Sequence, residues 1–258
     1  MDWVYTLAGL VVGFVVGLTG MGGGSLMTPL LVLFFGVPPA TAVGTDLLYA
    51  SITKAGGAWV HSTKGNVDWT IVGALAAGSV PAAIITAVVL VALELEEKHF
   101  AQLINGVLGV ALILTALALL LRDRLQRLKR STAAQREEKT RARLLATVAV
   151  GVVLGLLVTI SSVGAGVIGI VALLWLYPTV PSVRLVGVDI AHAVPLTAVA
   201  GLGHFYMGSV DFGLLGSLLL GSLPGIYLGS RLGSVFPDYI LRPTLACLLL
   251  VIGGRLVF

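Results

Sequence analysis

Long apolar runs, separated by short polar or glycine-rich breaks, occupy most of this 258-residue sequence. A run of roughly 20 apolar residues is long enough to cross the hydrocarbon core of a bilayer as a helix. Charged residues make up only 11% of the chain, whereas a soluble domain carries about a quarter. Because so few charges cannot form a water-facing surface, the sequence predicts an all-α polytopic membrane protein embedded in a lipid bilayer.

Three short motifs occur twice, each time 143 residues apart. The pairs are VGTDLLYA (Val43–Ala50) with VGVDIAHA (Val186–Ala193), HSTKGNVDW (His61–Trp69) with HFYMGSVDF (His204–Phe212), and GSVP (Gly78–Pro81) with GSLP (Gly221–Pro224). A constant offset across several motifs is typical of an internal duplication. We therefore expect two homologous membrane repeats, residues 1–121 and 144–258, joined by a linker at 122–143.

Each expected half contains five apolar segments. They lie at about 3–19, 24–36, 39–62, 67–93 and 100–121, and at about 144–160, 164–178, 181–205, 210–232 and 239–257. The first two segments of each half are short, and together they predict a helix that is interrupted by glycine or other small residues. The first ten residues lack a basic stretch, so we expect the first segment to be a retained helix and not a cleaved signal.

The linker 122–143 carries nine Lys or Arg and three Asp or Glu residues. Basic segments between membrane helices lie predominantly on the cytoplasmic side, so we expect a cytoplasmic linker. This topology explains the basic stretch without a nucleic-acid partner. Five segments is an odd number, so the halves should be inverted relative to each other, as in many secondary transporters. If the short pair crossed the membrane only once, the halves would instead be parallel.

The first break, GLTGMGGGSLMTP (Gly17–Pro29), is rich in glycine but is not a phosphate-binding loop. A P-loop needs Lys and Ser or Thr where Gly23 and Gly24 stand. The repeat offset aligns this break with the stretch around Ser162, so both halves interrupt a helix at the same place. A helix that begins after such a break presents unpaired N–H groups and the positive end of its dipole, which favours an anion. Alternatively, the glycines serve close helix packing.

Three stretches together resemble the sulfite exporter TauE/SafE family: GLTGMGGGSLMTPLLVLFFGVPPATAVGTDLL (residues 17–48), SSVGAGVIGIVALLWLYPTVPSVRLVGVDIAHAVPLTAVAGLGH (161–204) and GSLPGIYLGSRL (221–232). The resemblance extends over nearly the whole chain. It implies a multi-pass transporter of the bacterial-type inner membrane that moves sulfite or an organosulfonate such as sulfoacetate. The second break has Val163 and Ala165 where the first has Gly20 and Gly22, so the two breaks need not bind substrate equally.

Four ionisable residues lie inside expected helices, where a charge is costly and indicates function. Asp46 and Asp189 are repeat mates, whereas Lys54 corresponds to Thr197, so only one half supplies a cation. We expect Lys54 to meet Asp189 or the substrate. His192 shares a helix face with Asp189 and is suited to take up a proton. The aspartates have either a coupling role or a structural one, in which they accept hydrogen bonds from backbone amides at the breaks.

The expected function is transport of a small sulfur-containing anion, held near the midplane between the halves, with a proton or Na⁺ as the candidate coupling ion. The expected substrate-binding residues are Gly22, Gly23, Gly24, Ser25, Thr45, Lys54, Ser162, Gly164, Gly166 and His192. The alternative is a transporter of Na⁺ or another cation that uses Asp46 and Asp189.

The sequence lacks G-x-S-x-G and H-E-x-x-H motifs, and its single cysteine, Cys247, offers no disulfide or metal motif, so we expect neither an enzyme nor a cofactor. Gly225-x-x-x-Gly229 suits either a homodimer contact or packing within a monomer. His61 and His204 lie beside expected segment ends, where we expect them to be wet and interfacial.

Overall fold

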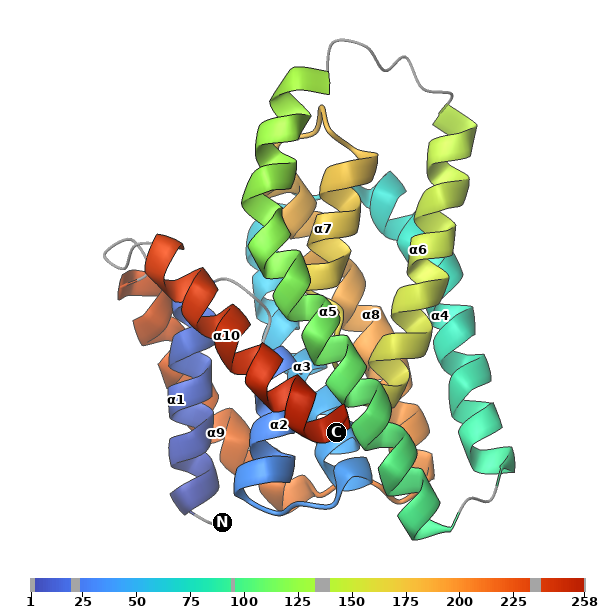
Figure 1. The fold of residues 1–258 in the computed structure, drawn as a ribbon, viewed down its shortest axis with the longest axis vertical. Coiled ribbons are helices and arrows are strands. Elements are labelled where there is room, and N and C mark those ends of the chain that lie inside the picture. The colour runs from blue at the N-terminus through green and yellow to red at the C-terminus, as the bar shows by residue number, and fades with distance from the viewer. Residues whose placement is uncertain (1–2, 20–23, 94–95, 133–139, 233–237, 258) are drawn as a thin grey trace.

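The computed structural model describes residues 3–19, 24–93, 96–132, 140–232 and 238–257, all of whose regular structure is helical (Figure 1). The ten helices are α1 (Trp3–Thr19), α2 (Gly24–Phe34), α3 (Pro39–Thr63), α4 (Trp69–Ala92), α5 (Glu97–Thr132), α6 (Thr140–Ser161), α7 (Val167–Leu176), α8 (Ser182–Tyr206), α9 (Phe212–Leu232) and α10 (Asp238–Val257). The expected all-α class is therefore confirmed.

Five helices of the described chain, α4, α5, α6, α8 and α9, are long and apolar enough to cross a membrane. Helix α3 has the same 25 residues as α8, but it carries more polar residues along its length. Helices α2 and α7 are short, with 11 and 10 residues. The expected segments agree with the helices, with the larger differences at three of them. Helix α5 begins at Glu97 and continues through the basic stretch to Thr132, α6 begins at Thr140, four residues earlier than expected, and α7 begins at Val167, three residues later.

The principal helix pairs each join one helix that precedes residue 133 with one that follows residue 139. Helix α1 packs on α9, α4 on α6, α3 on α8, and α5 on α10. In Figure 1, α1 and α9 lie at one side of the molecule and α4 and α6 at the other, with α3 and α8 between them. The same view shows α1 leading away from the end that holds the N-terminus, whereas α6 leads toward it.

Glycines allow two of these pairs to approach backbone to backbone. In α4 and α6, Gly78 lies against the carbonyl oxygen of Val148, and Gly151 lies against that of Leu75, each too closely for a Cβ atom. Helices α1 and α9 repeat this arrangement with six glycines that face the opposite helix, namely Gly9, Gly13, Gly17, Gly221, Gly225 and Gly229. Such contacts between small residues drive helix association in lipid, where the hydrophobic effect does not.

The Gly225-x-x-x-Gly229 motif serves packing within the chain. Gly225 faces the carbonyl oxygen of Leu10, and Gly229 faces that of Phe14, both in α1. This face of α9 is therefore covered by α1 and is not available as a contact surface for a second copy.

The repeated polar motifs after α3 and α8 fix the connections between helices. The Asn66 carbonyl oxygen lies against Gly187 of α8, and the Ser209 carbonyl oxygen lies against Gly44 of α3. Asp68 then caps the N-terminus of α4, because its Oδ1 accepts hydrogen bonds from the backbone N–H groups of the residues two and three positions later. Asp211 caps α9 in the same way.

Replacing Asp68 by alanine should lower the free energy of unfolding by about 1 kcal/mol, because the first turn of α4 loses its side-chain acceptor. The apparent melting temperature of the detergent-purified protein measures this effect. Asp68→Asn is the matched control, since asparagine caps helices about as well as aspartate. An equal loss in both variants would mean that the charge, and not the cap, is what matters.

Candidate functional site

The break between α6 and α7 has a non-helical, buried backbone. Ser162, Gly164 and Gly166 have φ values of 57°, 127° and 129°, in the region that glycine adopts at little cost. Residues 161–167 are all buried. Irregular backbone at membrane depth is tolerated where protein or an aqueous cavity surrounds it. The expected second break is therefore present, and α7 starts directly after it without a side-chain cap on its first N–H groups.

Part of the first break falls outside the described residues. Gly22 and Gly23 are not described, Gly24 is the first residue of α2, and the side chain of Ser25 is not described. Their expected role in substrate binding remains a prediction. The described geometry of the site is therefore that of α3, α8 and the second break.

Asp46 of α3 joins two other parts of the chain through one carboxylate oxygen. Its Oδ2 accepts a hydrogen bond from the Thr28 hydroxyl of α2 at 2.5 Å and one from the Ser162 hydroxyl of the second break at 3.0 Å. The side chain is fully buried, and its Oδ1 has no hydrogen-bond partner among the described residues. Asp46 thus connects the short helix α2 with the break that precedes α7.

Lys54, two helical turns further along α3, contacts the same break. Its ammonium group donates a hydrogen bond to the Ala165 carbonyl oxygen at 3.1 Å, and its side chain is 7% exposed. An ammonium group has three N–H donors, and the described hydrogen bonds occupy one of them. A buried cation therefore lies at the unwound segment, where an ionisable residue indicates function.

On α8, Asp189 and His192 contact different helices. Asp189 is buried against α7, where its Oδ1 lies so close to Gly169 that a Cβ atom there would collide with it. His192 is fully buried, and its Nε2 lies 2.7 Å from the Ser79 hydroxyl of α4. These nearest contacts are with different helices, but both residues lie close enough to Lys54 to interact with it electrostatically, as the sequence predicts for Asp189.

Two residues have a different setting from the one we expect from sequence. The Thr45 hydroxyl accepts a hydrogen bond from the Asp211 backbone N–H at 3.0 Å, so it holds the connection between α8 and α9. His204, expected to be wet, is fully buried, and its Nε2 lies 2.8 Å from the Thr159 carbonyl oxygen. The close packing of the α8 terminus against α6 is the reason for this second difference.

Sequence reasoning did not select Thr28, Ser79 or the Ala165 carbonyl as parts of the site. Thr28 lies inside the quoted glycine-rich motif, and Ser79 lies inside the repeated GSVP motif. A hydroxyl residue in each motif was therefore the available signal. The Ala165 carbonyl carries no side-chain signal at all.

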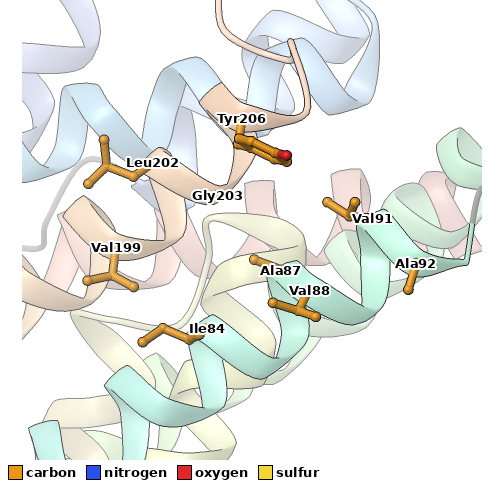
Figure 2. Close-up of a pocket in the computed structure, with 9 residues that line it drawn as sticks. All are labelled: Ile84, Ala87, Val88, Val91, Ala92, Val199, Leu202, Gly203 and Tyr206. Carbon is orange, nitrogen blue, oxygen red and sulfur yellow. The ribbon is translucent and has the colours of Figure 1, made fainter.

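An apolar groove of about 450 Å³ lies apart from these residues, between α4 and α8 (Figure 2). Its lining includes Ile84, Val88 and Val91 from α4 and Leu202 and Tyr206 from α8. Both helices are among the candidate membrane spans. A groove with so few polar groups cannot compensate the desolvation of a small anion, so we do not assign the substrate to it.

Buried ionisable residues that meet an interrupted helix within a bundle of spanning helices are typical of membrane transporters. The described part of the chain has this architecture, and the comparisons with known proteins agree with it. The chain belongs to the sulfite exporter TauE/SafE family, whose model matches residues 5–256. It is therefore a multi-pass membrane transporter and not an enzyme.

Similar proteins carry the same general description. Over 251 residues the chain is 39% identical to the probable membrane transporter protein YjnA of Bacillus subtilis (strain 168), covering 97% of this chain and 98% of the relative. It is 25% identical over 265 residues to the probable membrane transporter protein MJ0441 of Methanocaldococcus jannaschii, covering 95% and 92%. No solved structure matches the chain.

Proposed function

We propose that the protein transports a small sulfur-containing anion, sulfite or an organosulfonate such as sulfoacetate, and binds it at the helix breaks between two repeated halves. The observation that carries this proposal is the Lys54 ammonium, buried beside the Ala165 carbonyl of the second break. A buried ammonium group is costly unless an anion accompanies it. The Asp189 and Asp46 carboxylates act electrostatically on this ammonium, and a substrate anion at the break would add to that negative charge each time the site is occupied.

The start of α7 adds a second favourable element for an anion. Gly166, which precedes α7, has no side chain to cap the helix, and Val167 follows directly. The first N–H groups of a helix lack partners inside the helix, and the dipole places partial positive charge there. Lys54 and this helix end both act on the segment 162–166. An oxyanion bound there would accept hydrogen bonds from both.

Several features support an inverted repeat as the frame of this site. The pairing of α1 with α9 and of α4 with α6 is what a duplication that relates α1 to α6 and α4 to α9 requires. The Ser51 hydroxyl donates a hydrogen bond of 3.4 Å to the Val194 carbonyl oxygen, and the two residues are 143 positions apart, which is the repeat offset. The opposite directions of α1 and α6 in Figure 1 fit inversion rather than parallel halves. Such repeats place substrate at their interface near the bilayer midplane.

We further propose that the protein lies in a bacterial-type inner membrane with the basic segment 122–143 in the cytoplasm. The support is the excess of Lys and Arg in that segment, which orients membrane helices. The connection between α4 and α5 would then face outward. A cysteine introduced at Lys98, an exposed position in the first turn of α5 just after that connection, should react with an impermeant maleimide in intact cells.

Thermal shift on the detergent-purified protein tests the proposed substrate. Sulfite, sulfate, thiosulfate, sulfoacetate, taurine and Na⁺ are compared at equal ionic strength. A ligand that binds only the folded state stabilises it by about 2.7 kcal/mol at a hundred times its Kd, so one sulfur oxyanion or sulfonate should raise the apparent melting temperature. Stabilisation by Na⁺ alone would contradict the proposal and favour a cation transporter that uses Asp46 and Asp189.

A further inference from the structure

We propose that the Asp46 carboxyl group, held by Thr28 and Ser162, is the site at which a proton binds and is coupled to movement of the anion. This inference rests on the proposed anion transport and adds the coupling ion and its place. The sequence leaves either a coupling or a structural role open for both Asp46 and Asp189, with His192 beside Asp189 as a further proton acceptor; the inference assigns the proton to Asp46.

The two oxygens of Asp46 have unequal surroundings. Oδ2 accepts from Thr28 at 2.5 Å and from Ser162 at 3.0 Å, whereas Oδ1 is buried and has no hydrogen-bond partner among the described residues. A hydrogen bond of 2.5 Å from a hydroxyl is in the range of charge-assisted contacts to a carboxylate. A buried charge with one oxygen unsatisfied is costly. Binding a proton at this carboxyl removes that charge.

Hydroxyl partners allow both protonation states to be hydrogen-bonded. The Thr28 and Ser162 hydroxyl groups can each donate one hydrogen or accept one by rotating. When Asp46 is ionised, both donate to it, and α3 is tied to α2 and to the second break. When a proton binds at Oδ2, that oxygen becomes a donor, and one of the two hydroxyls turns from donor to acceptor. The proton therefore changes the contact between α3 and the break that we propose for the substrate.

The other titratable groups near Asp46 are less suited to this role. From α8 they are Asp189 and His192, and α3 itself adds Tyr49 and Lys54. The described spans of α2, α5, α6 and α9 carry acidic, basic and histidine residues only toward helix ends, namely Glu97, Lys98, His99, Arg122, Asp123, Arg124, Arg127, Lys129, Arg130, Arg141, Arg143 and Arg231. The His192 Nε2 already pairs with Ser79 at 2.7 Å, and the Lys54 ammonium is already bound to a carbonyl oxygen.

A polar pocket of about 370 Å³ offers a path for the proton from one side of the protein. It lies where the connection between α2 and α3, around Pro38 and Thr41, meets the start of α9 at Asp211. The backbone N–H of Asp211 is hydrogen-bonded to the Thr45 hydroxyl, and Thr45 directly precedes Asp46. The pocket is therefore linked through one hydrogen bond to the residue that precedes Asp46 in α3.

Transport in proteoliposomes tests the inference, with labelled sulfite and labelled sulfoacetate as separate probes. Sulfoacetate keeps its charge near neutral pH, so its response to pH reports on the protein. A gradient of one pH unit corresponds to about 1.4 kcal/mol, enough for up to about tenfold accumulation through one coupled proton. The wild type should accumulate substrate under the gradient. Asp46→Asn should lose this response and still exchange internal for external anion when no gradient is present.

Two further variants keep the inference falsifiable if Asp46→Asn does not fold. Asp46→Glu retains a titratable carboxyl and should keep a response to the pH gradient, whereas Asp68→Asn, at a helix cap, should behave as the wild type. Accumulation by Asp46→Asn equal to that of the wild type, or a wild type driven only by a Na⁺ gradient, would overturn the inference. Transport of neither anion by the wild type would instead overturn the proposed function.

Discussion

Replacing Lys54 by methionine should lower sulfite or sulfoacetate transport in proteoliposomes by at least about tenfold without unfolding the protein. A hydrogen bond that involves a charged group contributes about 1.5–3 kcal/mol, and 1.4 kcal/mol corresponds to a factor of ten in affinity. Methionine has a similar length and adapts to irregular surroundings. Removing one charge from a buried group of opposite charges destabilises the fold, because the remaining charge is left uncompensated, and the Asp189 and Asp46 carboxylates both act electrostatically on Lys54. The variant should therefore melt below the wild-type temperature while remaining folded at the assay temperature.

The position equivalent to Lys54 under the repeat offset provides a matched control. Thr197 lies on α8, and its hydroxyl donates to the Ala193 carbonyl oxygen of its own helix at 2.8 Å. Thr197→Val should leave transport close to the wild-type rate, because threonine is uncharged and supplies no cation to a bound anion. If Lys54→Met transported as well as the wild type, the Lys54 ammonium would have no part in anion binding and our proposal would fail at its central observation.

The second large effect concerns assembly of the bundle and not transport. Gly221→Val places a branched side chain where α9 meets the Thr6 carbonyl oxygen of α1 too closely even for a Cβ atom. Overpacking costs about 1–3 kcal/mol where neighbours can move, and the neighbour here is backbone, so we expect at least the upper end of that range. Size-exclusion chromatography and the apparent melting temperature should show a less stable, partly misassembled protein.

Gly216→Val separates this contact from the general effect of valine in a helix. Gly216 lies on the same helix, and a Cβ atom added there meets nothing within 4 Å. The two variants share the same change in helix propensity, so the difference between them reports the contact with α1 alone. Similar melting temperatures for both variants would mean that α1 and α9 are not packed as described.

The positions of the helices could be predicted well because membrane spans depend on a local property, the length of apolar runs. Helix α5 extends eleven residues beyond the expected end of its segment at residue 121, which shows that apolar length does not determine where a helix ends. Residues 122–132 are charged, so hydropathy ends the span before them, yet they contain no glycine or proline and many good helix formers. The helix therefore continues to Thr132 beyond its apolar part.

The site could be predicted only in part, because its contacts join residues that are far apart in sequence. The breaks and the buried ionisable residues are visible as exceptions to the apolar pattern. Their partners are not: Ser162 lies 116 residues from Asp46, and Ala165 lies 111 residues from Lys54. The repeated motif around His61 and His204 also contains polar residues, but several of them fix connections between helices. A repeated polar motif alone does not distinguish these roles.

The pairing of early helices with late ones limits the motions by which this protein could alternate its access. Helices α1, α3, α4 and α5 each have their main partner beyond residue 139. Helices from before residue 133 therefore alternate in space with helices from after residue 139. Neither set can move away from the other as a rigid body. Any moving unit must contain helices from both stretches. Each stretch expressed by itself would lack the surfaces against which its glycine faces pack, whereas the two expressed together could assemble without the connection between them.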